Sequence, residues 1–453
     1  MLNLLNNDFM KFKLLFGILI IISCSKESFD NFSFNNQSFN GELKWIKKFG
    51  GSSDDMANDI IETSDGNIAI IGSSSSLDGS IVDKNTNEFD FWFLKISQDG
   101  EVLLNKTYGG NGDDRGQSII EMSDGGFLLV GYSKSSDGDA TKNMGFHDNW
   151  IIRINSEGII LWEKSIGYSG HDHANSIIKT KGGGFFITGF LDVTASNGKG
   201  NYGKGVNYRH GVGEFWGHKL NSDGEIIWSR FFGGTNNDRS YDVVETNNEE
   251  FIIVGSTESN DIDISNNFGS YDYWAIKVDS QGDLLWERTY GGSGIDVAKS
   301  ISVLPNKNFL ILGNSFSDDF QITNSRGESD FWLIEIDTHG NLIKENSYGG
   351  SLFDSGQDIV EGPSGSYFLT GFSQSRDGNL TNNKGNNDIA ILHITSFKAI
   401  INSLNIGGSK IDIGNSSVFN RSGSLFVVGS SNSSDGDFTF SFGGSDLFVA
   451  KYD

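Results

Sequence analysis

Basic residues are scarce in this sequence of 453 residues: 34 Lys and Arg stand against 59 Asp and Glu, for a net charge of −25. Nucleic acid and anionic membrane surfaces are bound by clustered Lys and Arg, so we expect no nucleic-acid partner. Proline is nearly absent, with 2 residues, and cysteine occurs once, whereas 59 glycines and 35 phenylalanines are present. Glycine marks turns and phenylalanine suits half-buried strands, so this composition favours a repeat protein built of short strands.

The N-terminal region contains an apolar run at 14–22 that is too short to span a bilayer. It follows a positive segment at 10–13 and precedes Ser23 and Cys24. This order resembles a bacterial lipoprotein signal, with Ile21 to Cys24 in the lipobox position. The resemblance implies a signal peptide over residues 1–23, acylation of Cys24 and anchoring to a membrane. The alternative is a plain secretory signal with an incidental cysteine.

Residues 24–40 are rich in Asn and Ser, and we expect them to form a flexible tether that begins at the lipidated Cys24. The protein would then lie in the cell envelope, anchored to the outer membrane. The sequence leaves open whether it faces the periplasm or the medium.

Glycine pairs recur along the rest of the chain at a regular spacing, which predicts repeats of one structural unit. They begin at Gly50, Gly109, Gly233, Gly291, Gly349 and Gly407, so the steps are 59, 124, 58, 58 and 58 residues. The long step contains one degenerate copy at 167–170, which makes seven units. Each unit is expected to hold four strands separated by turn signals, as at 117–121, 127–130, 148–154 and 160–164.

Four short strands in each unit of about 58 residues indicate a seven-bladed β-propeller over residues 41–453. The repeats begin on the fourth strand of a unit, at 43–47, and end on the third strand, at 446–450. The N-terminal strand is therefore expected to complete the last blade. Such closure leaves no strand edge open to another chain, and we expect a monomer.

A glycine turn followed by tryptophan recurs at 158–162, 224–228 and 282–286. This pattern resembles the quinoprotein-like, PQQ-repeat propellers, and the whole unit resembles a repeat family of Bacteroidetes surface lipoproteins. The resemblance covers residues 41–453 and implies the fold, but a propeller hosts many unrelated activities. Quinoprotein enzymes also have an adjacent-cysteine element, which is absent because Cys24 is the only cysteine.

Two acidic positions recur in all seven units. The first set stands four residues after the second glycine position: Asp55, Asp114, Asp172, Asp238, Asp296, Asp354 and Asp412. The second set stands two residues before the aromatic position of the third strand: Asp90, Asp148, Glu214, Asp272, Asp330, Asp388 and Asp446. Short carboxylates accept hydrogen bonds from backbone amides at turns and strand ends, so one use per blade indicates a structural role. The alternative is a carboxylate pair for acid–base hydrolysis.

The polar loop between the second and third strands is also acidic, as at 136–139 and 434–437. An Asp-Gly-Asp loop could supply oxygen ligands to calcium, but calcium takes six to eight oxygens and the longer calcium-loop pattern is absent. We therefore expect a solvated turn and no cofactor, with calcium as the alternative.

The third unit departs from the others by an insertion. From Gly189 to Glu214 is 25 residues, against 17 or 18 in the other units. Long loops on a rigid scaffold often carry binding function, and Tyr and Arg are favoured where a ligand is held. The candidate binding residues are His171, His173, Tyr202, Tyr208, Arg209 and His210. A zinc site at His171, His173 and His210 would lack a full ligand set, so we predict no metal.

These observations favour a non-enzymatic binding or scaffolding propeller of the cell envelope, with a protein or a glycan as ligand. No nucleophile–base pair, complete metal site or phosphate loop emerges from the sequence. Two enzymatic alternatives stay open. One is an extracellular glycoside hydrolase, which needs two unrepeated carboxylates in a cleft. The other is a quinoprotein-like oxidoreductase.

Overall fold

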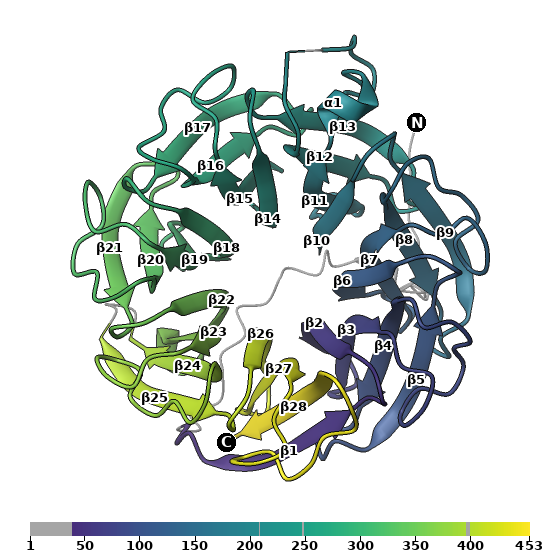
Figure 1. Ribbon diagram of the computed structural model, residues 1–453. Coiled ribbons are helices and arrows are strands. Elements are labelled where there is room, and N and C mark those ends of the chain that lie inside the picture. Colours follow the sequence, from purple (N-terminus) through teal and green to yellow (C-terminus); the bar gives the residue numbers. More distant parts are fainter. Residues whose placement is uncertain (1–38, 208, 247–248, 396–398) are drawn as a thin grey trace, which may run out of the picture. The chain divides into compact units, whose positions relative to one another are not determined.

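The predicted seven-bladed β-propeller is confirmed by a computed structural model, which describes residues 39–207, 209–246, 249–395 and 399–453. Seven four-stranded antiparallel sheets follow one another around a central channel (Figure 1). The expected signal peptide, the lipidation position Cys24 and Tyr208 lie outside the described residues. No helix in the described ranges is long and apolar enough to cross a membrane.

Each blade runs from an inner strand at the channel to an outer strand at the rim. Blade one contains β2 (Asp55–Glu62), β3 (Ile68–Ser74), β4 (Asp90–Ile96) and β5 (Val102–Tyr108). Blade two contains β6 (Asp114–Glu121), β7 (Phe127–Ser133), β8 (Asp148–Ile154) and β9 (Ile160–Ile166). Blade three contains β10 (His173–Lys179), β11 (Phe185–Leu191), β12 (Glu214–Leu220) and β13 (Ile226–Phe232), with the short helix α1 (Val193–Ser196) between β11 and β12. Blade four contains β14 (Asp238–Glu245), β15 (Phe251–Thr257), β16 (Asp272–Val278) and β17 (Leu284–Tyr290).

The remaining three blades follow the same order. Blade five contains β18 (Asp296–Val303), β19 (Phe309–Ser315), β20 (Asp330–Ile336) and β21 (Leu342–Tyr348). Blade six contains β22 (Asp354–Glu361), β23 (Tyr367–Ser373), β24 (Asp388–Ile394) and β25 (Ile400–Ile406), with a 3₁₀ turn at Pro363–Gly365. Blade seven contains β26 (Asp412–Phe419), β27 (Leu425–Ser431), β28 (Asp446–Tyr452) and, as its outer strand, β1 (Leu43–Phe49).

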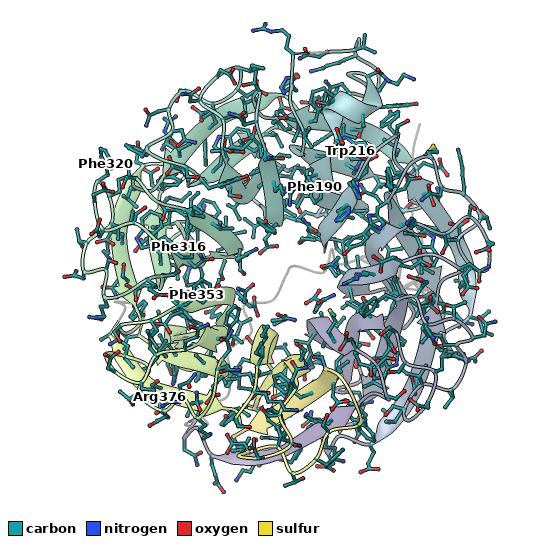
Figure 2. All side chains as sticks on the ribbon, viewed as in Figure 1. Phe190, Trp216, Phe316, Phe320, Phe353 and Arg376 are labelled. Carbon is teal, nitrogen blue, oxygen red and sulfur yellow. The ribbon has the colours of Figure 1, made fainter. Side chains whose placement is uncertain are left out.

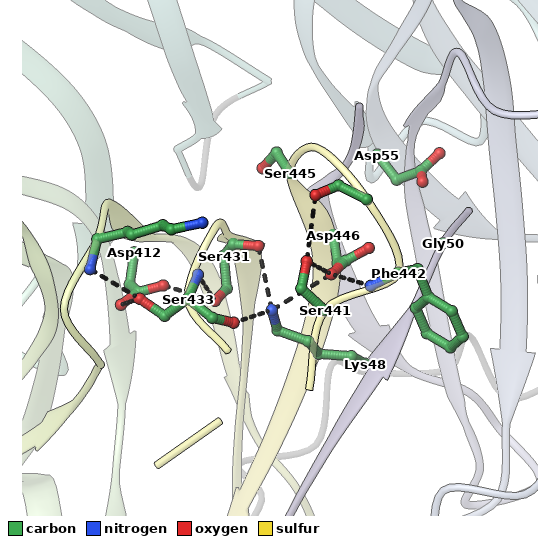
Figure 3. A network of polar contacts seen from close by, with 12 residues as sticks. Lys48, Gly50, Asp55, Asp412, Ser431, Ser433, Ser441, Phe442, Ser445 and Asp446 are labelled. Carbon is green, nitrogen blue, oxygen red and sulfur yellow. Dashed lines mark hydrogen bonds and ion pairs between the residues drawn. The ribbon is translucent and has the colours of Figure 1, made fainter. Parts of the chain in front are cut away.

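The N-terminal strand closes the ring, as expected. β1 pairs with β28 in an antiparallel register from Leu43–Tyr452 to Phe49–Leu447. The buried Lys48 of β1 donates to the carbonyl oxygens of Ser431 at 3.2 Å and Ser433 at 2.7 Å, and lies 3.3 Å from Asp446 Oδ2 (Figure 3). A lysine in this position thus ties the first strand of the propeller to its last two.

The core lies between neighbouring sheets. Five tryptophans of the third strands are buried to within 1% exposure: Trp92, Trp150, Trp216, Trp274 and Trp332. Ala390 and Phe448, also buried, stand at the same position in the last two blades. Several of these tryptophan rings pack edge-on or tilted against an aromatic side chain of the preceding blade; the ring centroids of Trp150 and Phe91, for example, lie 4.8 Å apart. These tryptophans therefore pack blade on blade and are closed to a ligand.

A β-bulge occurs at the same place in every inner strand, for example between Ala57 and Asp59 in blade one. A bulge re-aims a side chain and bends the strand. Here it directs two successive polar side chains of each blade into the channel, such as Asn58 and Asp59. The fold thereby lines its axis with polar groups.

Candidate binding surface on the loop face

Two loops of each blade lie on one face of the propeller, which we call the loop face. One is the Gly-Gly loop that enters the inner strand, and the other joins the second and third strands. In blade one, Ser75 N–H donates to Asp54 O at 2.9 Å and Ser52 N–H to Asp78 Oδ1 at 2.7 Å. These contacts hold the two loops side by side.

The first set of repeat acids is fully buried beneath these loops. Each of the seven carboxylates accepts the N–H of the second residue of its Gly-Gly loop at 2.6–2.9 Å. In five blades it also accepts two Ser or Thr hydroxyls, and in blade five Asp296 accepts one, from Ser317 Oγ at 2.9 Å. Asp354, for example, accepts from Ser373 Oγ and, at 2.8 Å, from Ser375 Oγ. Leu191 and Val193 stand at the hydroxyl positions in blade three. Burial raises the pKa of Asp172 there to about 7.

The second set of repeat acids lies on the other side of the same loops. In five blades Oδ2 accepts the N–H of the residue four positions earlier. In six blades Oδ1 is buried without a hydrogen-bond partner among the described residues, and it lies against the first glycine of the next Gly-Gly loop. A Cβ on that glycine would collide with the carboxylate, which is why the position is glycine. Burial raises the pKa of Asp90 and Asp272 to about 7.

One acid of the first set and one of the second set therefore lie close together at every blade junction, such as Asp90 and Asp114 on either side of Gly109. All fourteen acids are buried, and the arrangement repeats around the ring. These fourteen residues do not provide the single, open carboxylate pair that the glycoside hydrolase alternative requires.

The acids of the loop between the second and third strands also accept backbone amides. Asp137 Oδ1 accepts Asn111 N–H at 2.8 Å, and Asp435 Oδ1 accepts Ser409 N–H at 2.7 Å. Asp139 and Asp437 accept the N–H of Gly109 and Gly407 at 3.2 and 2.9 Å. Calcium would have to compete with these donors for the carboxylate oxygens.

The insertion of blade three runs from the loop face to the rim. Asp192 caps α1 by accepting Ala195 N–H at 2.8 Å, and the helix lies beside Gly170. The chain then follows the outer strand β13, where Tyr202 N–H donates to Ser229 O at 3.1 Å. The Tyr202 side chain is 61% exposed there, and Arg209 is exposed as well.

His210 is separated from the other two candidate histidines. It is buried, with Nδ1 3.3 Å from Glu214 Oε2 and its ring edge-on to Phe231. Burial lowers the pKa of His210 to about 4 and raises that of Glu214 to about 10. The pair is thus a hydrogen bond between neutral groups at pH 7, and the ligand set His171, His173 and His210 is not formed.

A different histidine, His147, joins His171 and His173. It lies directly before β8, and its Nδ1 is 2.9 Å from His171 Nδ1 and 3.4 Å from His173 Nε2. His173 is half-buried and stacks on Tyr132 at 3.7 Å, while the exposed His171 stacks on Phe146 at 5.0 Å. Desolvation, then His147, lowers the pKa of His173 to about 2. The sequence prediction missed His147. This residue directly precedes the second-set acid Asp148, just as His171 directly precedes the first-set acid Asp172, so a comparison of these two positions would have found the pair.

Aromatic side chains form two groups of ring contacts on the loop face of blades four to six. We call Phe268, Phe316, Phe320, Phe353 and Phe372 the phenylalanine surface. Ring centroids lie 5.5 Å apart for Phe268 and Phe320, 5.6 Å for Phe316 and Phe353, and 5.9 Å for Phe353 and Phe372. Phe320 is 67% exposed and Phe316 is 42% exposed. Figure 2 labels Phe320 near the rim and Phe316 and Phe353 nearer the channel.

The channel contains a second feature that sequence reasoning missed. Four residues after each first-set acid stands a side chain of a polar ring: Asp59, Ser118, Ser176, Asp242, Ser300, Asp358 and Ser416. The serines link the carboxylates; Ser300 Oγ lies 3.4 Å from Asp242 Oδ2 and 3.2 Å from Asp358 Oδ1. Together with neighbouring side chains the ring lines a hollow of about 150 Å³. The repeat register would have identified these positions.

No family model and no curated protein matches this sequence. Among solved structures, the chain is similar to a protein of unknown function from Bacteroides caccae, with 13% identity, a TM-score of 0.36 and coverage of 67% of this chain and 93% of that one. It is also similar to BamB from Moraxella catarrhalis, with 10% identity, a TM-score of 0.40 and coverage of 91% and 100%. The WD40 domain of Neurospora crassa Pan2 gives 9% identity, a TM-score of 0.47 and coverage of 90% and 95%.

Proposed function

We propose that this protein is a non-enzymatic binding module of the cell envelope, carried on a lipid at Cys24, which holds a protein partner on its phenylalanine surface. The observation that carries the proposal is the conformation of Phe320. Its φ is +50°, whereas Gly79, Gly138, Gly378 and Gly436 occupy the same loop position in four other blades with φ of 64–67°. Phe320 thus stands, exposed, where the repeat favours glycine.

The left-handed conformation costs a residue with a side chain about 1–2 kcal/mol. Burial does not offset this cost in the free protein, because two thirds of Phe320 is exposed. Backbone strain that persists at an exposed aromatic residue is explained when a partner covers the side chain. Ile262 takes the same position in blade four with φ +59°.

The chemistry of the surface favours a protein over a glycan. Glycan sites combine stacking on aromatic rings with polar groups matched to the sugar hydroxyls, and here the loop amides beside the phenylalanines already donate within the protein. Ser293 N–H donates to Asp319 Oδ1 and Ser351 N–H to Asp377 Oδ1, both at 2.7 Å. Exposed apolar rings are available instead, and the net charge of −25 favours a basic rim on the partner.

The experiment compares capture of envelope proteins by the immobilised wild-type chain, Phe320→Gly and the matched control Ile262→Gly. Phe320→Gly relieves the left-handed strain, so its folding stability should be unchanged or higher and lost binding cannot reflect unfolding. We expect a protein that wild type and Ile262→Gly retain and Phe320→Gly releases. Equal capture by all three variants, or binding of a glycan array instead, would overturn the assignment of this surface to a protein.

The anchor is tested separately. Replacement of Cys24 by serine should move the protein from the membrane fraction to the soluble fraction and abolish incorporation of a labelled fatty acid, because the thiol carries the acyl chain. A protein that stays in the membrane fraction without label would argue against lipidation.

A further inference from the structure

We propose that His147, His171 and His173 bind a divalent transition-metal ion of the zinc, nickel or copper class at the junction of blades two and three. The site is separate from the phenylalanine surface, and the proposal of metal binding does not depend on the function proposed for that surface.

The backbone brings two of the ligands together. His147 and His171 form a parallel bridge, and Asp172 N–H donates to His147 O at 2.8 Å. The same bridge joins Tyr271 to Ile295, Ser329 to Phe353 and Asn387 to Ile411 at three other junctions. Among these four bridges only the one between blades two and three has histidine at both positions. The repeat thus places two residues side by side at each of these junctions, and only the junction of blades two and three has a metal-binding side chain at both positions.

Hydrogen bonding alone does not satisfy the three nitrogens that converge here. His147 Nδ1 faces both His171 Nδ1 at 2.9 Å and His173 Nε2 at 3.4 Å. Nδ1 of a neutral imidazole carries either one proton or one lone pair, so it serves one of these two neighbours well and not both. A cation accepts all three lone pairs. With metal–nitrogen distances of about 2.0–2.1 Å, tetrahedral ligation places nitrogens about 3.3 Å apart, close to the two separations from His147 Nδ1. The ligand nitrogens of all three histidines lie within 4.8 Å of one another, so a small rotation of the exposed His171 ring would complete the site.

The surroundings supply the outer partners that metal-bound histidines usually have. His147 Nε2 is buried without a hydrogen bond among the described residues, 3.7 Å from Asp113 Oδ2. Arg115 Nε holds that carboxylate through a contact of 2.8 Å to Oδ1. Tyr132 and Phe146 stack on His173 and His171 and orient their rings. Asp113 is therefore a positioning residue for His147.

The ligand set selects the class of metal. Three imidazole nitrogens suit zinc, nickel and copper, whereas calcium and magnesium take oxygen ligands. Three protein ligands leave a coordination position for water or for a donor atom of a ligand. His171 is exposed on the loop face, and Asp113, which lies beside His147, also lines a neighbouring hollow of about 310 Å³. The site is thus open to the solvent on the loop face.

The experiment titrates zinc chloride into the chelator-treated full-length chain by calorimetry. The ligand variants take residues that the repeat itself uses at these positions, namely His171→Ile and His147→Asn, and the matched control is the exposed turn residue His339→Asn. We expect one ion per chain for wild type and for the control. Each ligand variant should weaken binding more than about 100-fold, and Asp113→Asn about 10–100-fold.

Cobalt gives a second readout that does not depend on a variant that folds. The wild-type chain with one equivalent of Co²⁺ should develop the intense visible bands of a tetrahedral nitrogen site, and Asp113→Asn should keep them at a weaker affinity. Zinc binding that His147→Asn and His171→Ile leave unchanged would overturn the proposal. So would the absence of stoichiometric binding, or a weak octahedral cobalt spectrum.

Discussion

Replacement of Asp354 by alanine should destabilise the propeller far more than replacement of Asp172, although both acids hold the same position in the repeat. Both carboxylates are fully buried, so each change removes the same atoms and leaves a comparable cavity. The two sites differ in the donors. Asp354 accepts from one amide and two hydroxyls, whereas Asp172 accepts only the amides of Tyr168 at 2.6 Å and Asp192 at 3.1 Å.

The magnitude follows from the donors that lose their acceptor and from the charge that no longer has to be buried. Each buried donor left unsatisfied costs about 1–3 kcal/mol. Against this, the pKa of Asp172 is raised from 3.8 to about 7. At pH 8 its ionisation in the folded state therefore costs about 4 kcal/mol, which the alanine variant recovers. The offset is smaller for Asp354, because the bonds from Ser373, Gly350 and Ser375 oppose the rise of its pKa.

We therefore expect a loss of about 3–5 kcal/mol for Asp354→Ala and of no more than about 1 kcal/mol for Asp172→Ala at pH 8. Unfolding entropy scales with chain length, so 1 kcal/mol shifts the Tm of a domain of this size by roughly 1 °C. Differential scanning calorimetry should show Tm lower by about 3–5 °C for Asp354→Ala and nearly unchanged for Asp172→Ala. Equal shifts would refute the account of the hydroxyl pair.

Three further predictions concern the same framework. Burial raises the pKa of Asp90, Asp172 and Asp272 to about 7, so the stability that their protonation contributes is complete near pH 4 and is lost as the pH rises through 7. Burial lowers the pKa of His210, His218 and His393 to about 4 or below, so these histidines add stability as the pH rises through their unfolded pKa of about 6.5 and contribute little change above pH 7. Tm should therefore fall between pH 7 and pH 8. A Tm that rises across this window would contradict the direction of these shifts. Gly349→Ala should lower the free energy of unfolding, measured with a chemical denaturant, by about 2–3 kcal/mol, because the added Cβ would collide with Asp330 Oδ1. The control Gly205→Ala should leave it unchanged, because a Cβ there meets no atom within 4 Å. Lys48→Met should lower the free energy of unfolding by about 3–5 kcal/mol, because it leaves Asp446 buried without its cation. Lys44→Met, at the surface, should change it by nearly nothing. Similar losses for the two variants would show that closure does not depend on the buried pair.

The sequence predicted the fold because the repeat imposes the same local requirement seven times. A glycine before the buried carboxylate recurs at a fixed interval in all seven units, serine or threonine stands at the hydroxyl positions in every blade but the third, and an aromatic residue stands on the third strand in every blade but the sixth. Even the degenerate copy at 167–170 keeps Asp172, so the count of seven blades survives the loss of the glycine pair. Closure followed from the strands at the two ends.

The candidate sites could be predicted only in part, because they depend on contacts between blades. His171 and His173 attract attention as neighbours in sequence, whereas His147 reaches them through a bridge between blades two and three. The insertion was expected beside the histidines, but its middle follows the outer strand β13, and Lys204 reaches Asp283 of the next blade at 2.7 Å. The strain at Phe320 depends on φ, which the amino-acid type does not reveal.

The junction between blades two and three shows how the framework tolerates residues that a site requires. Where the other blades have Ser or Thr at the two hydroxyl positions, blade three has Leu191 and Val193, which pack with Trp216 and Phe231 in an apolar cluster. Apolar burial thus replaces charge-assisted hydrogen bonds as the source of stability at this junction. Asp172 then needs only two amides, one of them from Asp192, which also caps α1. The residues on either side of the first-set acid differ from blade to blade, as Asp113 and Arg115 do from Ile295 and Val297, so these positions can carry His171 and His173 while the buried acid is kept.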